Sequence, residues 1–230
     1  MTKAVFFDLD GTFADTAPDL AHAANSMRRS RGMAPLPIEA TRPVTSLGAR
    51  GVIGVSFGIT PDHPDYAGLR EEFLSLYAVN LCRETRLFPG IAEALDAIEA
   101  RHVKWGIVTN KAERFARPLI ALLGYGGRAA CVIGGDTTGK IKPDPEPLFA
   151  ACREIGVRPG ECIYVGDDER DIVAGRAAGM KTIAVEYGYL NGGAPVTWGA
   201  DSVIRHPREL LDCIQIKGTL PPEQASDETK

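Results

Sequence analysis

The chain alternates short, β-rich apolar runs with amphipathic segments of helical period, and this alternation limits the possible folds most strongly. The expected strands cover residues 4–9, 105–109, 131–133, 162–165, 182–185 and 202–204. The expected helices between and after them cover residues 91–101, 112–123, 147–155, 168–178 and 207–216. Strands that alternate with helices form a parallel sheet with helices on both faces. We therefore predict an α/β fold with a Rossmann-like, mainly parallel sheet of about five or six strands flanked by helices.

One long interval breaks this rhythm. Residues 16–87 contain helical patterns at 17–31, 50–57 and 66–82 but no convincing strand. A chain of 230 residues has room for one large domain and a smaller insertion, because domains average about 150 residues. We predict an inserted α-helical cap subdomain over this interval.

The remaining residues then form one core domain and a tail. The predicted core consists of residues 1–15 and 88–216, and residues 217–230 have so little apolar content that we expect a mobile tail. A hydrophobic fraction of 44% excludes a disordered chain. A net charge of −4 gives no reason to expect nucleic acid or a membrane as partner. Five cysteines without a metal-like spacing favour a reducing compartment, so we expect a cytoplasmic protein.

The first chemical motif follows the strand expected at residues 4–9. It places Asp8 and Asp10 two residues apart, before a turn formed by Gly11 and Thr12. Strand alternation would direct both carboxylates to one face, and the carboxyl ends of parallel strands form the ligand crevice of an open sheet. A polar turn after a buried strand is the alternative interpretation. We favour a functional pair, because Asp is depleted in strands.

A second acidic motif follows the strand expected at residues 162–165. Asp167, Asp168, Glu169 and Asp171 place four acids within five positions. Helix capping accounts for one or two of them, because helix N-termini favour acidic side chains. A divalent cation accounts for more, because Mg²⁺ prefers carboxylate oxygens and retains several waters. The sequence thus indicates a Mg²⁺ site shared by two strand ends.

Two further strand ends carry polar groups. Thr109, Asn110 and Lys111 follow a predicted strand, and alone they are typical of a helix N-cap. Lys142 lies in a proline-rich string before the helix expected at 147–155, and alone it would be interpreted as a solvated surface lysine. Together, the four strings bring a carboxylate pair, a hydroxyl, a lysine and an acidic cluster to successive strand ends.

In this order the strings resemble the four motifs of the haloacid dehalogenase superfamily of phosphotransferases. The matching strings are DLDGT at 8–12, VTN at 108–110, KPDP at 142–145 and GDDERD at 166–171. The resemblance implies the core fold of that superfamily with an inserted helical cap that closes over the site. It also implies a Mg²⁺-dependent phosphatase that hydrolyses a small phosphorylated metabolite.

The resemblance assigns a catalytic role to each motif. Asp8 would be the nucleophile that forms an aspartyl-phosphate. Asp10 would first protonate the leaving oxygen and then activate the hydrolytic water. Thr109 and Lys142 would contact the phosphoryl oxygens. The presence of Asp10 favours phosphate ester chemistry, because dehalogenases of the superfamily typically lack this pairing.

The resemblance also implies a metal site. Mg²⁺ would be bound by the Asp8 carboxylate, the Asp10 main-chain oxygen and Asp167, with Asp171 orienting its waters. Asp168 lies at a position that the family pattern leaves open. We therefore interpret it as a helix cap or as a residue that holds the metal ligands in place without binding the ion.

Specificity would come from the substrate-binding residues and the cap. Those expected to bind phosphate or substrate are Gly11, Asn110 and, at the start of a cap helix, Arg50. A plain surface arginine is the alternative for Arg50. Strings at 48–50, 109–111, 142–147, 187–189, 198–201 and 207–210 look most similar to phosphoglycolate phosphatases and to N-acetylmuramic acid 6-phosphate phosphatases.

Alternatives of other classes remain at this point. A β-phosphoglucomutase-like phosphotransferase uses the same carboxylate pair and the same kind of cap. A non-catalytic ligand-binding or regulatory module could keep the fold without turnover, although the four intact motifs argue against it. We expect a small phosphorylated metabolite as partner and a monomer or homodimer as assembly.

Overall fold

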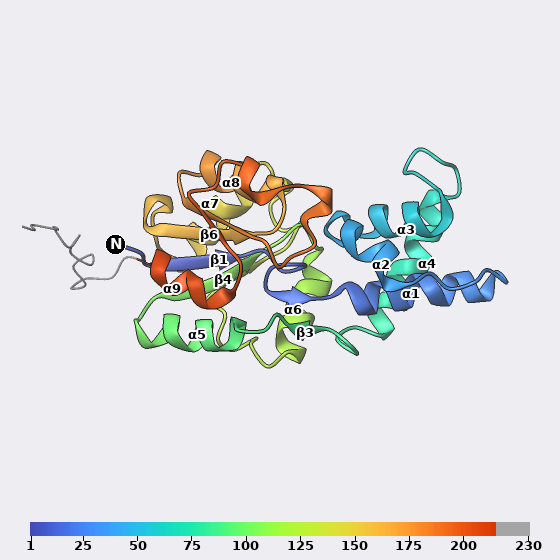
Figure 1. Ribbon diagram of the computed structural model, residues 1–230, viewed down its shortest axis with the longest axis horizontal. Helices are drawn as coiled ribbons and strands as arrows, with labels where there is room; N and C mark the ends of the chain where they lie inside the picture. Colours follow the sequence, from blue (N-terminus) through green and yellow to red (C-terminus); the bar gives the residue numbers. More distant parts are fainter. Residues whose placement is uncertain (215–230) are drawn as a thin grey trace, which may run out of the picture.

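A central sheet of six parallel strands organises the molecule (Figure 1). A computed structural model describes residues 1–214. The strands run in the spatial order β5-β4-β1-β6-β7-β8. Their bounds are β1 Ala4–Phe7, β4 Lys104–Val108, β5 Val132–Ile133, β6 Cys162–Gly166, β7 Lys181–Val185 and β8 Ser202–Ile204. The predicted fold class is confirmed.

The strand β1 occupies the middle of the sheet because its side chains are apolar on both faces. All four of its residues are buried, as expected for a parallel strand covered by helices on each side. Val5 is in register with Trp105 of β4 and with Ile163 of β6. The polar residues that follow these three neighbouring strands therefore emerge at one edge of the sheet.

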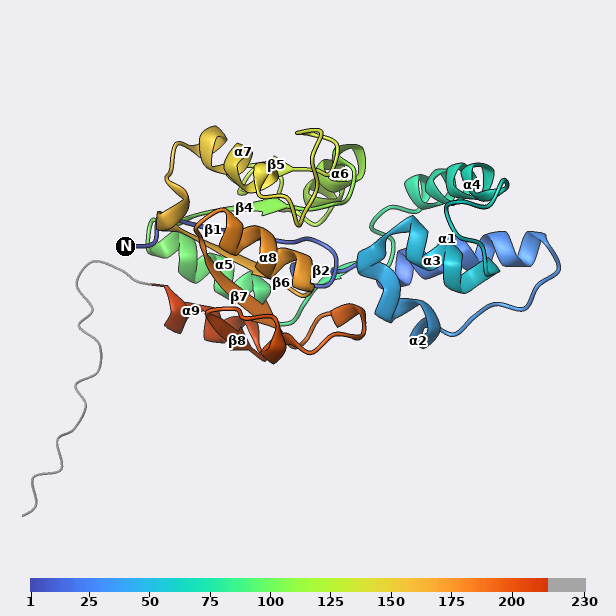
Figure 2. The same ribbon diagram turned by 90° about the horizontal axis from the view of Figure 1, so that it is seen from above.

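Helices cover both faces of the sheet (Figure 2). The helices α5 (Ile91–Ala100), α6 (Glu113–Leu122) and α9 (Leu210–Cys213) contribute to one apolar cluster, which includes Val5, Trp105 and Ile163. The helices α7 (Glu146–Ile155) and α8 (Glu169–Ala177) border the opposite cluster around Phe6 and Tyr164. The alternating side chains of β1 thus contribute to two separate apolar clusters, one on each face of the sheet.

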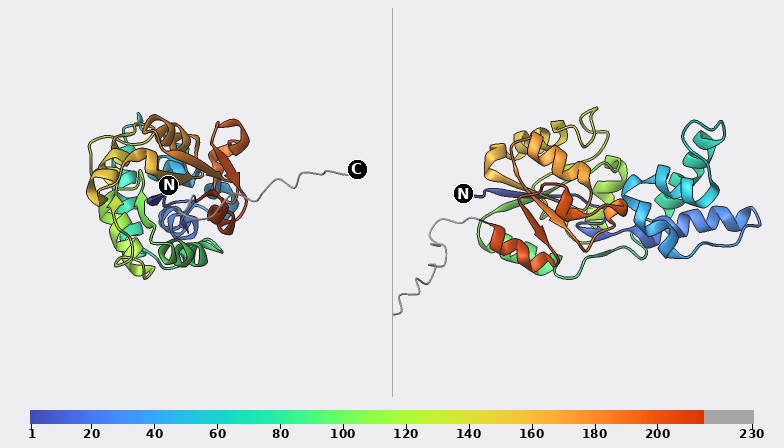
Figure 3. Two further views of the ribbon diagram at one scale, coloured as in Figure 1. Left: turned by 90° about the vertical axis from the view of Figure 1, so that its left-hand side faces the viewer. Right: turned by 45° about the horizontal axis from the view of Figure 1, so that its top comes forward.

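A helical subdomain lies beyond the carboxyl edge of the sheet (Figures 1 and 3). It contains α1 (Ala17–Ser30), α2 (Ile38–Thr41), the 3-10 helix η1 (Arg42–Leu47), α3 (Ala49–Phe57) and α4 (Tyr66–Val79). Residues of α1, α3 and α4 form an apolar cluster of their own, to which Phe115 of the core adds its ring. We call these helices the cap.

Two short strands connect the cap to the core. The strand β2 (Ala14–Asp15) pairs antiparallel with β3 (Arg86–Leu87), so the chain leaves and re-enters the core at adjacent residues. The expectation that residues 16–87 lack a strand is therefore wrong at β3. A two-residue strand has no periodicity that a sequence pattern could reveal, and its partner lies far away in the chain.

The C-terminal region differs from expectation in one further respect. The predicted helix at 207–216 is divided into the 3-10 helix η5 (Pro207–Glu209) and α9. The last two residues of that prediction and the predicted tail at 217–230 lie outside the described residues. Within residues 1–214, no helix has the length and apolar character needed to cross a membrane.

Phe13 anchors the turn that follows β1. It is fully buried, stacks on Trp105 with 5.5 Å between ring centroids, and meets Phe7 edge-on at 5.9 Å. Tyr125 completes the aromatic cluster at 6.0 Å from Phe13. Aromatic packing around Phe13 thus holds in place the turn that carries Asp8 and Asp10.

We expect Phe13→Ala to lower the free energy of unfolding by about 3–5 kcal/mol, because it leaves a cavity in this aromatic cluster. Urea denaturation followed by circular dichroism would measure the change. Leu122→Ala is a suitable control, because Leu122 is 61% exposed and a surface change should stay within about 0.5 kcal/mol. Similar small losses in both variants would contradict a structural role for Phe13.

Candidate active site

Two aspartates from neighbouring strands meet at the carboxyl edge of the sheet. Asp8 directly follows β1, and its backbone N–H donates to the carbonyl of Val165 at 2.9 Å, which continues the pairing with β6. Asp167 directly follows β6. Together with Asp171 in the first turn of α8, these residues offer carboxylate oxygens that lie within 4.8 Å of one another. All three side chains are buried.

Lys142 lies among these acids and partly balances them. Its ammonium nitrogen Nζ is 2.9 Å from Asp8 Oδ1 and 2.7 Å from Asp171 Oδ1. It also donates to the hydroxyl of Tyr164 at 2.7 Å. The side chain is 2% exposed, so the interpretation as a solvated surface lysine is wrong. Burial alone would lower the pKa of Lys142, but Asp171 and Asp8 raise it overall.

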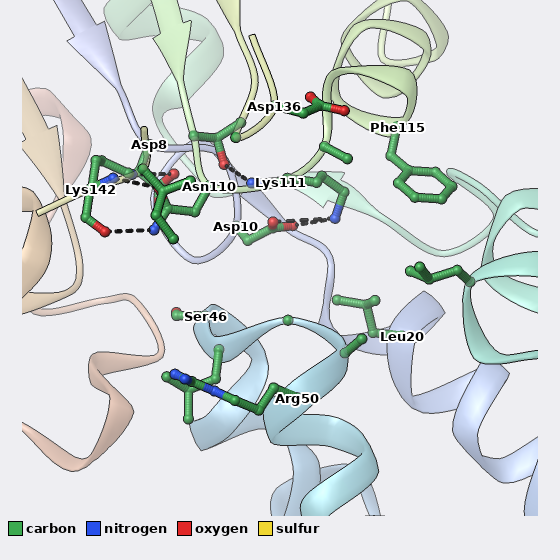
Figure 4. Close-up of a pocket in the computed structure, with 18 of the residues that line it drawn as sticks. Asp8, Asp10, Leu20, Ser46, Arg50, Asn110, Lys111, Phe115, Asp136 and Lys142 are labelled. Atoms are coloured by element: carbon green, nitrogen blue, oxygen red, sulfur yellow. Dashed lines mark hydrogen bonds and ion pairs between the residues drawn. The ribbon is translucent and has the colours of Figure 1, made fainter. Parts of the chain in front are cut away.

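Asn110 holds Lys142 in place through the backbone. Its side-chain Oδ1 accepts from the Lys142 backbone N–H at 2.9 Å, and its Nδ2 donates to the Lys142 carbonyl at 3.0 Å (Figure 4). These two bonds join the end of β4 to the loop after β5. The sequence analysis expected Asn110 to bind phosphate or substrate but did not indicate this side-chain clamp.

One buried lysine does not fully compensate three buried carboxylates. Burial together with repulsion from Asp8 and Asp171 raises the pKa of Asp167 to about 8. Burial raises the pKa of Asp171 to about 6, against the opposing attraction of Lys142. Asp8 Oδ1 is buried and accepts no well-directed hydrogen bond from any described residue, although Lys142 is close. Such a cluster fits a divalent metal ion, because it supplies hard oxygen ligands whose negative charge the protein does not fully balance.

Neighbouring residues pack closely against the acidic centre, which consists of the carboxylates of Asp8, Asp167 and Asp171. Asp167 accepts from the Thr12 hydroxyl at 2.8 Å and from the Tyr189 N–H at 2.9 Å. Gly11 has φ +92°, and a Cβ atom there would lie 2.1 Å from Asp167 Oδ2. Glycine is therefore required at this turn. Gly11 packs against Asp167 and is not among the residues that line the cavity described below.

Asp10 is held by a lysine that the sequence analysis gave no role. Lys111 Nζ lies 3.0 Å from Asp10 Oδ1 and 3.2 Å from Oδ2, and the Thr16 hydroxyl donates to Oδ1 at 2.5 Å. Lys111 also lies 4.7 Å above the ring of Tyr77 in the cap. The sequence placed Lys111 two residues after Thr109, at the same strand end, and this position could have marked it as a site residue. The position alone does not show that Lys111 contacts Asp10 and Tyr77.

Asp168 supports the site from the start of α8. Its side chain accepts from the Arg170 N–H at 2.9 Å and pairs with the Arg170 guanidinium at 2.8 Å. The capping interpretation of Asp168 is therefore confirmed. Arg170 also donates to the carbonyl of Ser46 at 3.0 Å, which links the core to the cap.

A cavity of about 530 Å³ opens between the acidic centre and the cap (Figure 4). The predicted site residues that line it are Asp8, Asp10, Arg50, Thr109, Asn110, Lys142 and Asp171. Arg50 lies in the first turn of α3, and Thr109 is buried directly after β4. Residues predicted from four separate sequence motifs thus line the same cavity.

The strand order and the acids at the edge of the sheet define a Rossmann-like α/β protein with an acidic centre beneath a helical cap. A family model described as haloacid dehalogenase-like hydrolase matches residues 5–185, and the chain belongs to that family. The resemblance inferred from the four motifs is confirmed.

Curated relatives cover nearly the full length. The chain is 45% identical over 213 residues to the N-acetylmuramic acid 6-phosphate phosphatase of Pseudomonas aeruginosa, covering 92% of this chain and 94% of the relative. It is 44% identical over 209 residues to a phosphoglycolate phosphatase of Xylella fastidiosa, covering 90% and 91%. A crystal structure of a predicted phosphoglycolate phosphatase from Haemophilus somnus superposes with a TM-score of 0.83 at 26% identity, covering 93% and 98%. The chain is a phosphatase of this family.

The metal-free protein should lose stability as pH rises. The pKa of Asp167 is near 3.9 in the unfolded chain and about 8 in the fold, so the folded state binds more protons between these values. The free energy of unfolding therefore falls as pH rises through this window. Melting temperatures of EDTA-treated protein at several pH values would show the decline, and added Mg²⁺ should oppose it most strongly near pH 8.

Asp167→Asn is the matched control for this prediction. It is nearly the same size but cannot ionise, so most of the pH dependence of the metal-free protein should disappear. A melting temperature of the unaltered protein that does not change across this window, or the same slope in the variant, would contradict the assignment.

Proposed function

We propose that the protein is a Mg²⁺-dependent phosphatase that hydrolyses a small phosphomonoester through an aspartyl-phosphate intermediate. The observation that carries the proposal is the placement of Asp8. Its carboxylate borders the cavity, lies 2.9 Å from the buried ammonium group of Lys142, and is followed two residues later by Asp10 at the same cavity. Phosphoryl transfer requires this combination of nucleophile, cationic support and proton donor.

The first step uses Asp8 and Asp10. A carboxylate oxygen of Asp8 attacks phosphorus, the ester P–O bond breaks, and the departing oxygen takes a proton from Asp10. Thr109 and Lys142 donate to the phosphoryl oxygens, where negative charge accumulates. In the second step Asp10 accepts a proton from water, the water oxygen bonds to phosphorus, and the bond to Asp8 breaks to release phosphate.

The metal would be held by the acids at the sheet edge. The carboxylates of Asp8 and Asp167 and the main-chain oxygen of Asp10 would bind Mg²⁺, with Asp171 beside them. When bound, the ion supplies positive charge that neutralises the phosphoryl oxygens. The raised pKa of Asp167, caused by burial and by neighbouring acids, supports a cation at this position.

We further propose that residues 16–87 act as a lid over this site. The lid contacts residues beside the acids of the site, because Tyr77 packs on Lys111 and the carbonyl of Ser46 accepts from Arg170. A closed lid excludes water and completes the pocket. Substrates of the phosphoglycolate and N-acetylmuramic acid 6-phosphate types are the candidates, based on the names of the relatives and on Arg50 at the cavity.

Asp8→Asn tests the nucleophile. Phosphate release from an aryl phosphate should fall by about a thousandfold or more, because the amide cannot form the acyl phosphate. Circular dichroism and the melting temperature should show an intact fold. A variant that keeps substantial activity would refute the assignment of Asp8.

Lys111→Met tests the support of Asp10. Without the ammonium group, Asp10 keeps the Thr16 hydroxyl as its remaining described side-chain partner, so kcat should fall about 10- to 100-fold through misplacement of the proton donor. Lys140→Met is the control, because Lys140 is 65% exposed and pairs with Asp144 away from the acids of the centre. Steady-state kinetics with an aryl phosphate would separate kcat from KM. Equal effects in both variants would exclude a specific role of Lys111.

A further inference from the structure

The basic side chains around the cavity fall into two groups. Those of the first group have carboxylate partners: Lys142 pairs with Asp8 and Asp171, Lys111 with Asp10, and Arg170 with Asp168. The second group consists of Arg50, Arg70 and Arg114, all exposed and all lining the cavity. None of these three pairs with a carboxylate anywhere in residues 1–214.

The three arginines line the cavity from different elements. Arg50 comes from α3, Arg70 from α4 and Arg114 from α6, so two belong to the cap and one to the core. Figure 4 shows Arg50 across the cavity from Asp8 and Lys142. The remaining acid of the lining, Asp136, accepts from the Glu113 N–H at 2.7 Å and so caps α6. The cap side of the cavity therefore has positive charge that the protein does not neutralise.

Tyr77 adds an uncommitted donor to the same cavity. Tyr77 lines the cavity, and its buried hydroxyl donates to no described residue. Burial raises the pKa of Tyr77 to about 12, so the hydroxyl stays protonated. A buried hydroxyl without a partner is costly unless a ligand satisfies it.

The size and walls of the cavity indicate a ligand larger than a two-carbon acid. A volume of about 530 Å³ lies within the range of about 300–1,000 Å³ that is typical of sites for drug-sized ligands. Leu20, Phe73 and Phe115 line it with apolar surface, which suits the faces of a sugar ring. Thr109 and Lys142 would bind the phosphate group, so the arginines remain available to bind another part of the ligand.

We propose that Arg50, Arg70 and Arg114 form a second anion subsite that binds a carboxylate of the substrate, which is then a phosphorylated sugar acid rather than a phosphorylated neutral sugar. This inference rests on the proposed phosphatase function. Arginine suits the task because its planar donors match a carboxylate in bidentate geometry. An anion held jointly by the cap and by α6 would also favour the closed position of the lid.

The test compares two esters that differ in one lactyl ether group, which carries the carboxylate. N-acetylmuramic acid 6-phosphate carries a lactyl carboxylate, and N-acetylglucosamine 6-phosphate has the same phosphorylated sugar without it. We expect the unaltered protein to prefer the sugar acid by about 10- to 100-fold in kcat/KM, since bonds to charged groups contribute at this scale. Glucose 1,6-bisphosphate, added as a third probe, should be a poorer substrate than the sugar acid.

Arginine-to-glutamine variants then locate the subsite. Arg70→Gln and Arg114→Gln should each lose most of this preference through a higher KM for the sugar acid, with kcat/KM for N-acetylglucosamine 6-phosphate changed by about twofold or less. Arg101→Gln is the control, because Arg101 is exposed at the end of α5 and does not line the cavity.

Several outcomes would overturn the inference. They are equal losses on both sugars, an unchanged preference in the variants, no preference in the unaltered protein, or a preference for the bisphosphate. If Asp8-dependent hydrolysis of an aryl phosphate persists in any of these cases, the proposed phosphatase function stands and the subsite alone is refuted. If no ester is hydrolysed, the proposed function and the subsite fail together.

Discussion

The ion pairs of Lys142 with Asp8 and Asp171 are the interaction on which the site depends. Three carboxylates within 4.8 Å would repel one another in a buried space, and Lys142 supplies the ammonium group at 2.7 and 2.9 Å that holds two of them. Removing one partner of such a buried pair leaves an uncompensated charge. The order of β4, β1 and β6 and the side-chain clamp of Asn110 bring these groups together.

The acidic centre is connected to the cap through side chains that contact the proposed catalytic residues. Lys111 contacts Asp10 on one side and the ring of Tyr77 on the other. Ser46 of the cap donates to Asp167 at 3.3 Å and accepts from Arg170. A movement of the cap would therefore change the surroundings of Asp10, the proposed proton donor, and of Asp167, a candidate metal ligand, together. In the proposed mechanism, substrate binding and acid–base chemistry share the same contacts.

The sequence predicted the core well because the sheet is buried on both faces. Parallel strands of this kind leave uninterrupted apolar runs, and the residues that end these runs, such as Asp8 and Thr109, mark the edge of the sheet. Contacts between distant segments left no such signal. The clamp of Asn110 on Lys142, the pairing of Lys111 with Asp10 and the strand β3 each depend on residues brought together by the fold. The four-motif resemblance named the acids, but the burial of Lys142 required the structure.

The β2–β3 ribbon has a consequence for how such a protein can diversify. Because Ala14 pairs with Leu87 and Asp15 with Arg86, the two ends of the inserted segment lie side by side, at the usual strand spacing of about 4.8 Å. A segment attached in this way can be lengthened, shortened or exchanged without displacing β1 or β4. The part of the chain that we propose selects the ligand can thus accumulate substitutions without moving the strands that carry the acids, and selectivity can evolve while the reaction is preserved.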